Sequence, residues 1–149
     1  MIRNYVEDKY SEKNRGRKFF WFDMFSAGEG GSEKAVRVDQ SESEVSAKKR
    51  SKLFENVFVF KGDVLQTYVE NSFFSGRNIG FAHFDLNDHN VELSVIKKAV
   101  KFAESGTVFL FDDFAMSPFR NQNRKYRKFF RSIGLEILEL PTGQGLVIF

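Results

Sequence analysis

The chain has 149 residues and contains no cysteine, only two histidines and only two prolines. Without cysteine it can form neither disulfides nor thiolate metal sites, and this fits a reducing compartment, so we expect a cytoplasmic location. It also lacks an apolar run of about 18 residues, the length from which a membrane-spanning helix is recognised. Residues 1–18 are polar and lack the apolar core of a signal peptide. We therefore expect neither a membrane segment nor a membrane partner.

The composition is otherwise that of an ordinary globular protein. Hydrophobic residues make up 42% of the chain, and 19 phenylalanines supply much of this apolar mass. The length suits a single domain over residues 1–149, beginning with the polar segment 1–18. Residues 26–52, rich in glycine, serine and charge, predict a mobile loop and then a short helix around residues 42–53. The net charge of +3 is too mild to indicate a nucleic acid as a partner.

Two predicted strands each end abruptly in carboxylates. The strand predicted over residues 78–85 ends in Asp85, and the one over residues 107–112 ends in the pair Asp112 and Asp113. Both segments are short, rich in aromatic and β-branched residues, and bounded by glycine or asparagine, which is typical of buried strands.

Between these strands, residues 91–104 have the apolar spacing of a helix, with Asn90 as the expected N-cap and Gly106 as the expected stop. A strand–helix–strand unit requires a right-handed crossover and therefore a parallel pair of strands. Parallel strands end at the same edge of a sheet, so the three aspartates should converge there. Open α/β sheets bind their ligands at this edge.

Three ionised carboxylates at one edge repel one another, so either a pKa rises or a cation lies among them. Because the available ligands are oxygens, a hard divalent ion such as Mg²⁺ is favoured, with Mn²⁺ and Ca²⁺ as alternatives. The simpler interpretation of each aspartate is a cap on the next helix or a solvated side chain. We favour a metal site at Asp85, Asp112 and Asp113 because the three occur together on adjacent strands.

Three segments resemble the macrocin O-methyltransferase (TylF-type) family: HFDLN at residues 83–87, FLFDDF at residues 109–114 and LPTGQGLVIF at residues 140–149. The resemblance extends over residues 19–149 and implies an α/β fold with the Rossmann-like sheet of class I S-adenosylmethionine-dependent methyltransferases. It implies methyl transfer from S-adenosylmethionine to a hydroxyl of a sugar or glycosylated small molecule, which is the expected partner. It also implies that the same three aspartates bind a divalent metal, Mg²⁺.

The general base is the position at which this chain departs from the family's pattern. The better-studied members have an aspartate two residues after the first metal ligand, where this chain has Asn87. A neutral amide cannot usefully accept a proton, so Asp88 or His89 would take this role, or the metal lowers the hydroxyl pKa unaided. The catalytic candidates are therefore Asp85, Asn87, Asp88 and His89, and Asp85 is also an expected cofactor contact.

Two further predicted strands end in residues that could hold the cofactor. Residues 19–23 predict a strand ending in Asp23, and an acidic residue there commonly accepts hydrogen bonds from ribose hydroxyls. The resemblance places Asp23 and Phe25 beside the cofactor ribose. It places Asp63, which follows a strand predicted over residues 57–61, beside the adenine. The alternative for Asp23 is a cap of a helix or turn.

Residues 124–133 predict an amphipathic helix that ends at Gly134. Its apolar face is formed by Tyr126, Phe129, Phe130 and Ile133. Its other positions are basic: Arg124, Lys125, Arg127, Lys128 and Arg131. Such a run is either a phosphate or nucleic-acid patch or the solvated side of a helix, and we favour the solvated side. Strands are predicted over residues 135–140 and 146–149, and the resemblance implies that they are antiparallel.

No segment before residue 19 resembles the first strand and glycine-rich loop with which class I methyltransferases begin. The expected sheet is therefore N-terminally truncated, and three explanations stay open: a fragment of a longer enzyme, half of a split enzyme, or a shortened fold without methyl transfer. The contrasting hypothesis for the function is a non-catalytic or split methyltransferase-fold module that binds a partner subunit or ligand. Both a homo-oligomer and a complementing subunit are compatible with it.

Overall fold

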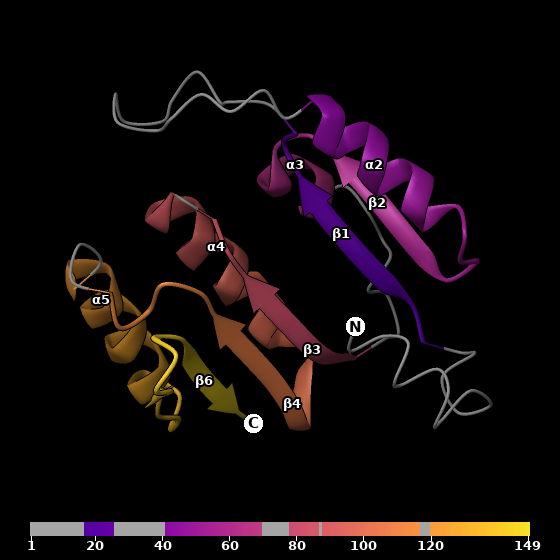
Figure 1. Cartoon of the computed structure of the whole chain (residues 1–149). Coiled ribbons are helices and arrows are strands. Elements are labelled where there is room, and N and C mark those ends of the chain that lie inside the picture. Colours follow the sequence, from indigo (N-terminus) through magenta and orange to yellow (C-terminus); the bar gives the residue numbers. More distant parts are fainter. Residues whose placement is uncertain (1–16, 26–40, 70–77, 87, 117–119) are drawn as a thin grey trace. The chain divides into compact units, whose positions relative to one another are not determined.

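The computed structural model describes residues 17–25, 41–69, 78–86, 88–116 and 120–149 (Figure 1). The chain divides into two compact units, Met1–Glu70 and Asn71–Phe149. Most of the polar segment before residue 19, and the part of the expected mobile loop before residue 41, lie outside the described residues. The single domain expected from the sequence stays a prediction. None of the described helices combines the length and the apolar composition needed to cross a bilayer.

The described part of the first unit consists of two parallel strands and two helices (Figure 1). In chain order these are β1 (Phe19–Asp23), α2 (Ser41–Ser51), β2 (Val57–Lys61) and α3 (Val64–Val69). The register runs from Phe19 opposite Val57 to Asp23 opposite Lys61. Both strands have the bounds that the sequence predicts, and α2 confirms the short helix, which ends two residues earlier than expected.

Aromatic rings hold the first unit together. Phe20 stacks on Phe58 with ring centroids 5.6 Å apart, and Phe22 stacks on Phe60 at 5.0 Å. Tyr68 of α3 meets Phe22 edge-on at 5.9 Å and is buried, which raises the pKa of its hydroxyl to about 12. Such ring pairs add about 0.5–1.5 kcal/mol each beyond the burial of their area.

In the second unit, the described residues form a four-stranded mixed sheet with two α-helices (Figure 1). Its elements are β3 (Ile79–Phe84), α4 (His89–Ala99), the short 3₁₀-helix η2 (Val100–Phe102), β4 (Ala103–Phe111), α5 (Arg120–Ser132), β5 (Leu138–Glu139) and β6 (Gly145–Ile148). The strand order is β3-β4-β6-β5, in which β3 and β4 are parallel and β6 is antiparallel to both its neighbours. This confirms the parallel strand–helix–strand unit and the antiparallel end of the sheet.

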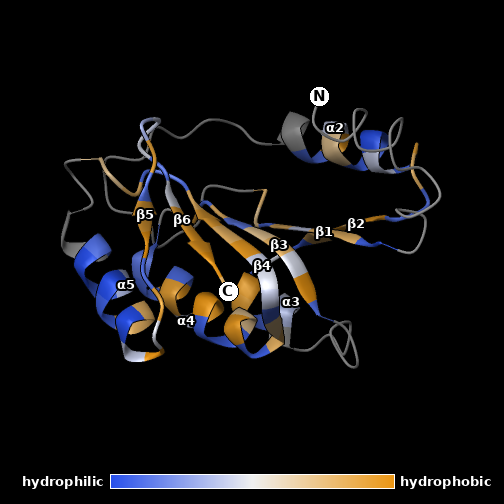
Figure 2. Cartoon of the chain, turned by 90° about the horizontal axis from the view of Figure 1, so that it is seen from below, coloured by the Kyte–Doolittle hydropathy of each residue, from blue (hydrophilic) through white to orange (hydrophobic). Residues whose placement is uncertain are grey.

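The core of the second unit is also mainly aromatic. Phe84 of β3 stacks on Phe111 of β4 at 5.3 Å, and Phe111 contacts Phe130 of α5 at 5.6 Å. Phe109, Phe111 and Phe130 are fully buried, and burial of each such ring stabilises the fold by about 1.5–3 kcal/mol. In Figure 2 the apolar residues of this unit are concentrated in the strands and α4, whereas α5 is largely hydrophilic.

The boundary between α4 and β4 differs from the prediction. The N-cap of α4 is Asp88 rather than Asn90, because the Asp88 side chain accepts hydrogen bonds from the backbone N–H groups of Asn90 and Val91. The helix ends at Ala99 and β4 begins at Ala103, so Gly106 does not end the helix but lies inside the strand, with φ 91. The Thr107 hydroxyl explains the longer strand, because it donates to Ile79 O at 2.6 Å and accepts from Glu104 N at 2.9 Å.

The C-terminal end of α5 confirms one prediction and corrects another. Gly134 has φ 80, and the bonds from Gly134 N to Arg131 O and from Leu135 N to Phe130 O form the paired cap expected for a glycine stop. Ile133 lies beyond the helix and is 42% exposed, so it does not belong to the apolar face. Of the strand predicted over residues 135–140, only Leu138–Glu139 pairs with β6, opposite Leu146 and Gly145.

Candidate functional site at the carboxyl edge of β3 and β4

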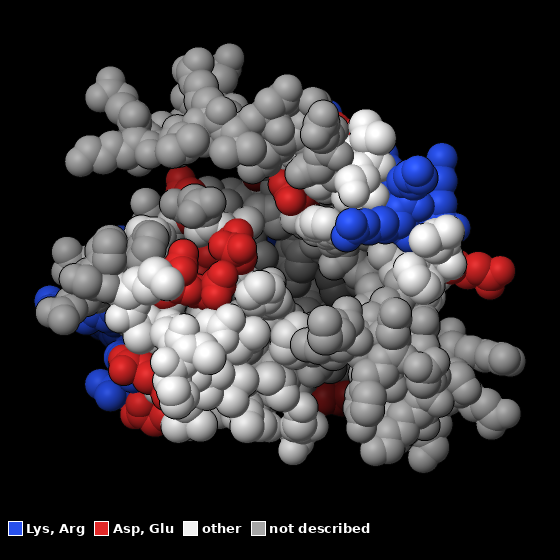
Figure 3. All heavy atoms as spheres, viewed as in Figure 1, with Lys and Arg blue, Asp and Glu red and all other residues white. Residues whose placement is uncertain are grey.

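The structure brings Asp85 and Asp112 together at the ends of neighbouring parallel strands. Phe84 of β3 is in register with Phe111 of β4, and the backbone N–H of Asp112 donates to Phe84 O at 2.9 Å. Asp85 and Asp112 are the next residues of their strands, so they leave the sheet side by side. In Figure 3 acidic side chains gather over the ends of β3 and β4.

The turn after Asp112 has an unusual backbone conformation. Asp113 has φ 52, a left-handed conformation that aspartate tolerates better than most residues. The next side chain, Phe114, is buried and lies against Gly145 of β6, where a Cβ atom would come within 2.6 Å of Phe114 Cγ. The buried ring therefore anchors the turn that carries both aspartates.

Gln144 is a site residue that the sequence interpretation missed. Its Nε2 donates to Asp112 Oδ1 at 3.1 Å, and its Oε1 accepts from the Thr142 hydroxyl at 2.9 Å. The LPTGQG segment carried the family resemblance, yet no role followed for its glutamine. The available signal was position, because a turn that leads into a strand beside β4 lies close to the end of β4.

Glu92 is a second missed residue. It is 3% exposed on α4, its Oε2 accepts from Leu86 N at 2.9 Å, and its Oε1 accepts from the Tyr126 hydroxyl at 2.9 Å. Burial raises the pKa of Glu92 to about 7, against the lowering effect of these two hydrogen bonds, and the charges of Asp85 and Asp112 raise it further. The sequence signal was helical spacing, because Glu92 shares a face with the buried residues Val95, Ile96 and Ala99.

The expected metal set is only partly assembled. Among the described residues, no group of three or more histidine, aspartate or glutamate side chains is arranged to hold a metal ion. Asp85 and Asp112 offer two carboxylates at one edge, and an all-oxygen donor set suits a hard divalent cation. Asn87 lies outside the described residues. The site of three aspartates therefore stays a prediction, and two of its members fit it by position.

The other catalytic candidates lie at the start of α4. Asp88 Oδ1 accepts from Asn90 N at 2.9 Å and from Val91 N at 3.1 Å, which is the capping role considered for such aspartates. His89 is half-buried, and burial lowers the pKa of its imidazole, with opposing effects from Asp88 and Lys125. A neutral imidazole can accept a proton, so His89 has the chemistry of a base at neutral pH.

The cofactor candidates Asp23 and Asp63 lie together in the first unit. Asp23 Oδ1 accepts from Phe25 N at 2.9 Å, and Asp23 O accepts from Gly62 N at 3.0 Å. Asp63 Oδ1 accepts from Leu65 N at 2.8 Å and so caps the start of α3. Asp23 thus performs the local role considered as its alternative, and Asp63 performs a similar one. The second carboxylate oxygen of each has no hydrogen bond within the described part of the chain.

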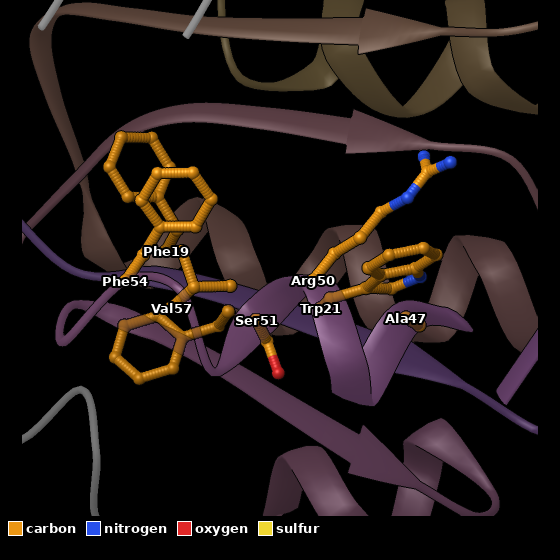
Figure 4. Close-up of a pocket in the computed structure, with 8 residues that line it drawn as sticks. Phe19, Trp21, Ala47, Arg50, Ser51, Phe54 and Val57 are labelled. Carbon is orange, nitrogen blue, oxygen red and sulfur yellow. The ribbon is translucent and has the colours of Figure 1, made fainter. Parts of the chain in front are cut away.

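Neither Phe25 nor the apolar pocket of the first unit has the features of a cofactor contact. Phe25 is 4% exposed, has φ 49 and lies 5.8 Å from the Trp21 ring, so its side chain packs inside the unit. A pocket of about 290 Å³ lies between α2 and the two strands. In Figure 4 Phe19 and Phe54 lie at one end of it and Arg50 at the other. Its wall is almost entirely apolar, without the convergent polar groups that orient a cofactor.

The basic residues of α5 are partly used within the fold. Arg127 lies 5.0 Å from the centre of the Phe114 ring, donates to Ile137 O at 3.1 Å, and forms an ion pair with Glu139. Arg131 pairs with Glu136 at 2.9 Å. These contacts favour the solvated and structural interpretation of the run over a nucleic-acid patch.

No protein-family profile and no curated protein sequence matches this chain. Solved structures do match. The apo structure of CalS11, a TDP-rhamnose 3′-O-methyltransferase of calicheamicin biosynthesis, has a TM-score of 0.68 at 18% identity, over 97% of this chain and 64% of that chain. A second structure of CalS11, a calicheamicin methyltransferase, has a TM-score of 0.70 at 17% identity, over 97% of this chain and 65% of that chain. The O-methyltransferase NovP has a TM-score of 0.66 at 15% identity, over 99% of this chain and 64% of that chain.

At such low identity the similarity concerns the fold and not the roles of individual residues. It agrees with the sheet described above, in which a parallel pair is followed by antiparallel strands. The chain therefore has the α/β, Rossmann-like fold of methyltransferases such as CalS11 and NovP, and it spans 64–65% of their length.

Proposed function

We propose that this chain is the core of an S-adenosylmethionine-dependent O-methyltransferase that acts on a hydroxyl of a sugar or of a glycosylated small molecule. The observation that supports this most is the pair of Asp85 and Asp112 at the carboxyl edge of a methyltransferase-type sheet. Open α/β sheets bind their ligands at this edge. The fold similarity to CalS11, a TDP-rhamnose 3′-O-methyltransferase, supports a sugar as the class of acceptor.

In this proposal Asp85 and Asp112 hold a divalent cation, with Asp113 as the expected third ligand and Mg²⁺ as the expected ion. A cation bound there would orient neighbouring hydroxyls of the acceptor and lower their pKa. Gln144 keeps one oxygen of Asp112 in a fixed direction. Asp112 therefore offers an oriented carboxylate rather than a freely rotating one.

S-adenosylmethionine, when bound, supplies the methyl group. Asp23 and Asp63 would accept hydrogen bonds from its ribose and its adenine amino group, through the carboxylate oxygens that their local turns do not use. His89 is the best candidate among the possible bases, because burial keeps its imidazole neutral. Asp88 is less suited, since its Oδ1 already accepts two backbone hydrogen bonds.

A second candidate function is a split or non-catalytic module that binds a partner subunit. Within the described residues, β1 pairs only with β2, and β3 pairs only with β4. One edge of β1 and one edge of β3 therefore have no described strand beside them, and an open strand edge can accept a strand from another chain. The chain also spans only 64–65% of the matching enzymes.

Calorimetric titration of the purified chain with S-adenosylmethionine, with and without Mg²⁺, tests the first proposal. Micromolar binding would support a cofactor site and justify a search for hydroxyl acceptors. No binding by a chain shown to be folded would favour the second candidate. Light scattering of the same sample would then show whether the chain forms oligomers.

Paired variants separate the two parts of the proposal. Asp23→Asn should weaken the binding of S-adenosylmethionine and leave Mn²⁺ binding unchanged, whereas Asp112→Asn should do the reverse. Glu136→Gln is the matched control, because Glu136 forms an exposed ion pair with Arg131 and has no part in the proposed sites. Unchanged Mn²⁺ binding by Asp112→Asn would remove the metal from the proposal.

A further inference from the structure

Glu92 of α4 joins the turn that carries Asp85 to the helix α5. Its Oε2 accepts from the backbone N–H of Leu86, the residue directly after Asp85, at 2.9 Å. Its Oε1 accepts from the hydroxyl of Tyr126 on α5 at 2.9 Å. One side chain therefore connects α4, the turn after β3, and α5.

The Glu92 contacts are shielded from water. Glu92 is 3% exposed and Tyr126 is 1% exposed. A buried hydrogen bond is hard to replace, because water cannot reach the donor or acceptor that loses its partner. The hydrogen bond from Leu86 N to Glu92 fixes the peptide group between Asp85 and Leu86. The orientation of this peptide group determines the direction in which the Asp85 side chain extends from the backbone.

If Glu92 only filled space in the core, nothing would require a carboxylic acid at this buried position. Its surroundings on α4 are apolar, with Val95, Ile96 and Ala99 buried on the same face. A buried acid next to two further carboxylates is unfavourable, since the charges of Asp85 and Asp112 act on it. An apolar side chain of the same volume would avoid this repulsion but could not hold the turn.

We propose that Glu92 is a positioning residue, whose carboxyl group fixes the Asp85–Leu86 turn and thereby holds Asp85 beside Asp112 for a divalent cation. The part concerning the cation rests on the proposed function, whereas the fixing of the turn does not. Residues that orient metal ligands in this way commonly change metal affinity by about 10–100-fold when they are lost.

Two substitutions of similar volume separate positioning from packing. Glu92→Gln keeps both contacts, because the amide oxygen can accept from Leu86 N and the amide N–H can donate to the Tyr126 oxygen. Glu92→Met keeps the volume but offers no acceptor to Leu86. Tyr126→Phe keeps Glu92 and removes the hydroxyl that is its second anchor. It serves as the test variant if Glu92→Met does not fold.

The experiment measures Mn²⁺ affinity by calorimetry and amide hydrogen exchange at residues 85–88 in the full chain. We expect Glu92→Met to lose about tenfold or more in Mn²⁺ affinity and to exchange the Leu86 amide faster, while Glu92→Gln stays close to wild type. Tyr126→Phe should show a smaller change in the same direction. Equal Mn²⁺ affinity in wild type and Glu92→Met would overturn the positioning of Asp85.

Failure of the proposed function gives a different result. If the wild-type chain binds no Mn²⁺, the proposed cation site is wrong, and the exchange data alone decide the role of Glu92. Faster exchange in Glu92→Met and protected amides in Glu92→Gln would still support the fixed turn. Unchanged exchange at Leu86 in Glu92→Met would overturn it.

Discussion

The side-chain amide of Gln144 donates a hydrogen bond to Asp112 Oδ1 at 3.1 Å, across 32 residues of sequence. The amide is itself held by the Thr142 hydroxyl at 2.9 Å. The turn between β5 and β6 thereby controls the orientation of a carboxylate at the end of β4. This contact leads to the first of four predictions.

Gln144→Ala should weaken Mn²⁺ binding by about tenfold, because Asp112 loses the donor that orients it. Thr142→Val should have a smaller effect, since it removes only the group that holds the amide. Calorimetry on both variants measures the two effects. Full Mn²⁺ affinity in Gln144→Ala would mean that the contact is incidental to the site.

Gly145→Ala should lower the free energy of unfolding by about 1–3 kcal/mol, because the added Cβ would lie 2.6 Å from Phe114 Cγ. Gly80→Ala is the matched control, since Gly80 also lies in a strand of the second unit and a Cβ there meets nothing within 4 Å. Urea unfolding compares the two variants. Equal losses would contradict overpacking as the cause, and a second substitution, Phe114→Leu, should relieve the loss in Gly145→Ala.

Glu92 should make the stability of the metal-free chain depend on pH. Its pKa is about 7 in the folded chain and 4.5 when unperturbed, so between these values the folded chain keeps a proton that the unfolded chain has released. The free energy of unfolding should therefore fall as pH rises from about 4.5 through about 7. The stability that the protonated Glu92 contributes is fully present below this pH window and lost above it.

Glu92→Gln isolates this effect from other titrating groups. The difference in unfolding free energy between wild type and Glu92→Gln, measured with urea and a chelator at several pH values, should change across the same window. All other groups are common to the two proteins, so their contributions largely cancel in this difference. A difference that is flat with pH would show that Glu92 ionises normally in the folded chain.

Arg127→Met should destabilise the chain by about 1–3 kcal/mol, because the Phe114 ring loses its cation and Ile137 O loses its donor. Lys128→Met removes a charge from the same helix at an exposed position and should change stability by less than about 0.5 kcal/mol. Thermal unfolding of both variants measures the contrast. Equal effects would support a purely electrostatic role for the basic run.

Strands β1, β2 and β3 were predictable from the sequence because each is a short segment rich in aromatic or β-branched residues. β1 and β2 have the predicted bounds, and the parallel pairing of β3 with β4 follows from the helix between them. The end of α4 was not predictable in this way. Val100 and Ala103 fit a helical pattern, yet Ala103 pairs with Ile79, and this contact with another strand extends β4 at the helix's expense.

The convergence of Asp85 and Asp112 followed from chain topology, whereas the residues that hold them did not. Glu92 is 34 residues from its partner Tyr126, and Gln144 is 32 residues from Asp112. A sequence pattern records which face of a helix is apolar, but not which distant donor meets a polar side chain on that face. Asp88 accepts local capping hydrogen bonds, yet the sequence pattern predicts Asn90 as the cap, so the exact position of a local motif was also missed.

Trp21 is the single tryptophan of the chain, and it lies on β1 in the first unit. Its indole is 47% exposed, so its emission should shift to longer wavelength when β1 separates from its surroundings. Fluorescence therefore reports the melting of the first unit alone, while circular dichroism reports both. Coincident melting curves would mean that the two units unfold as one cooperative body, and separate curves would give each unit its own melting temperature without any labelling.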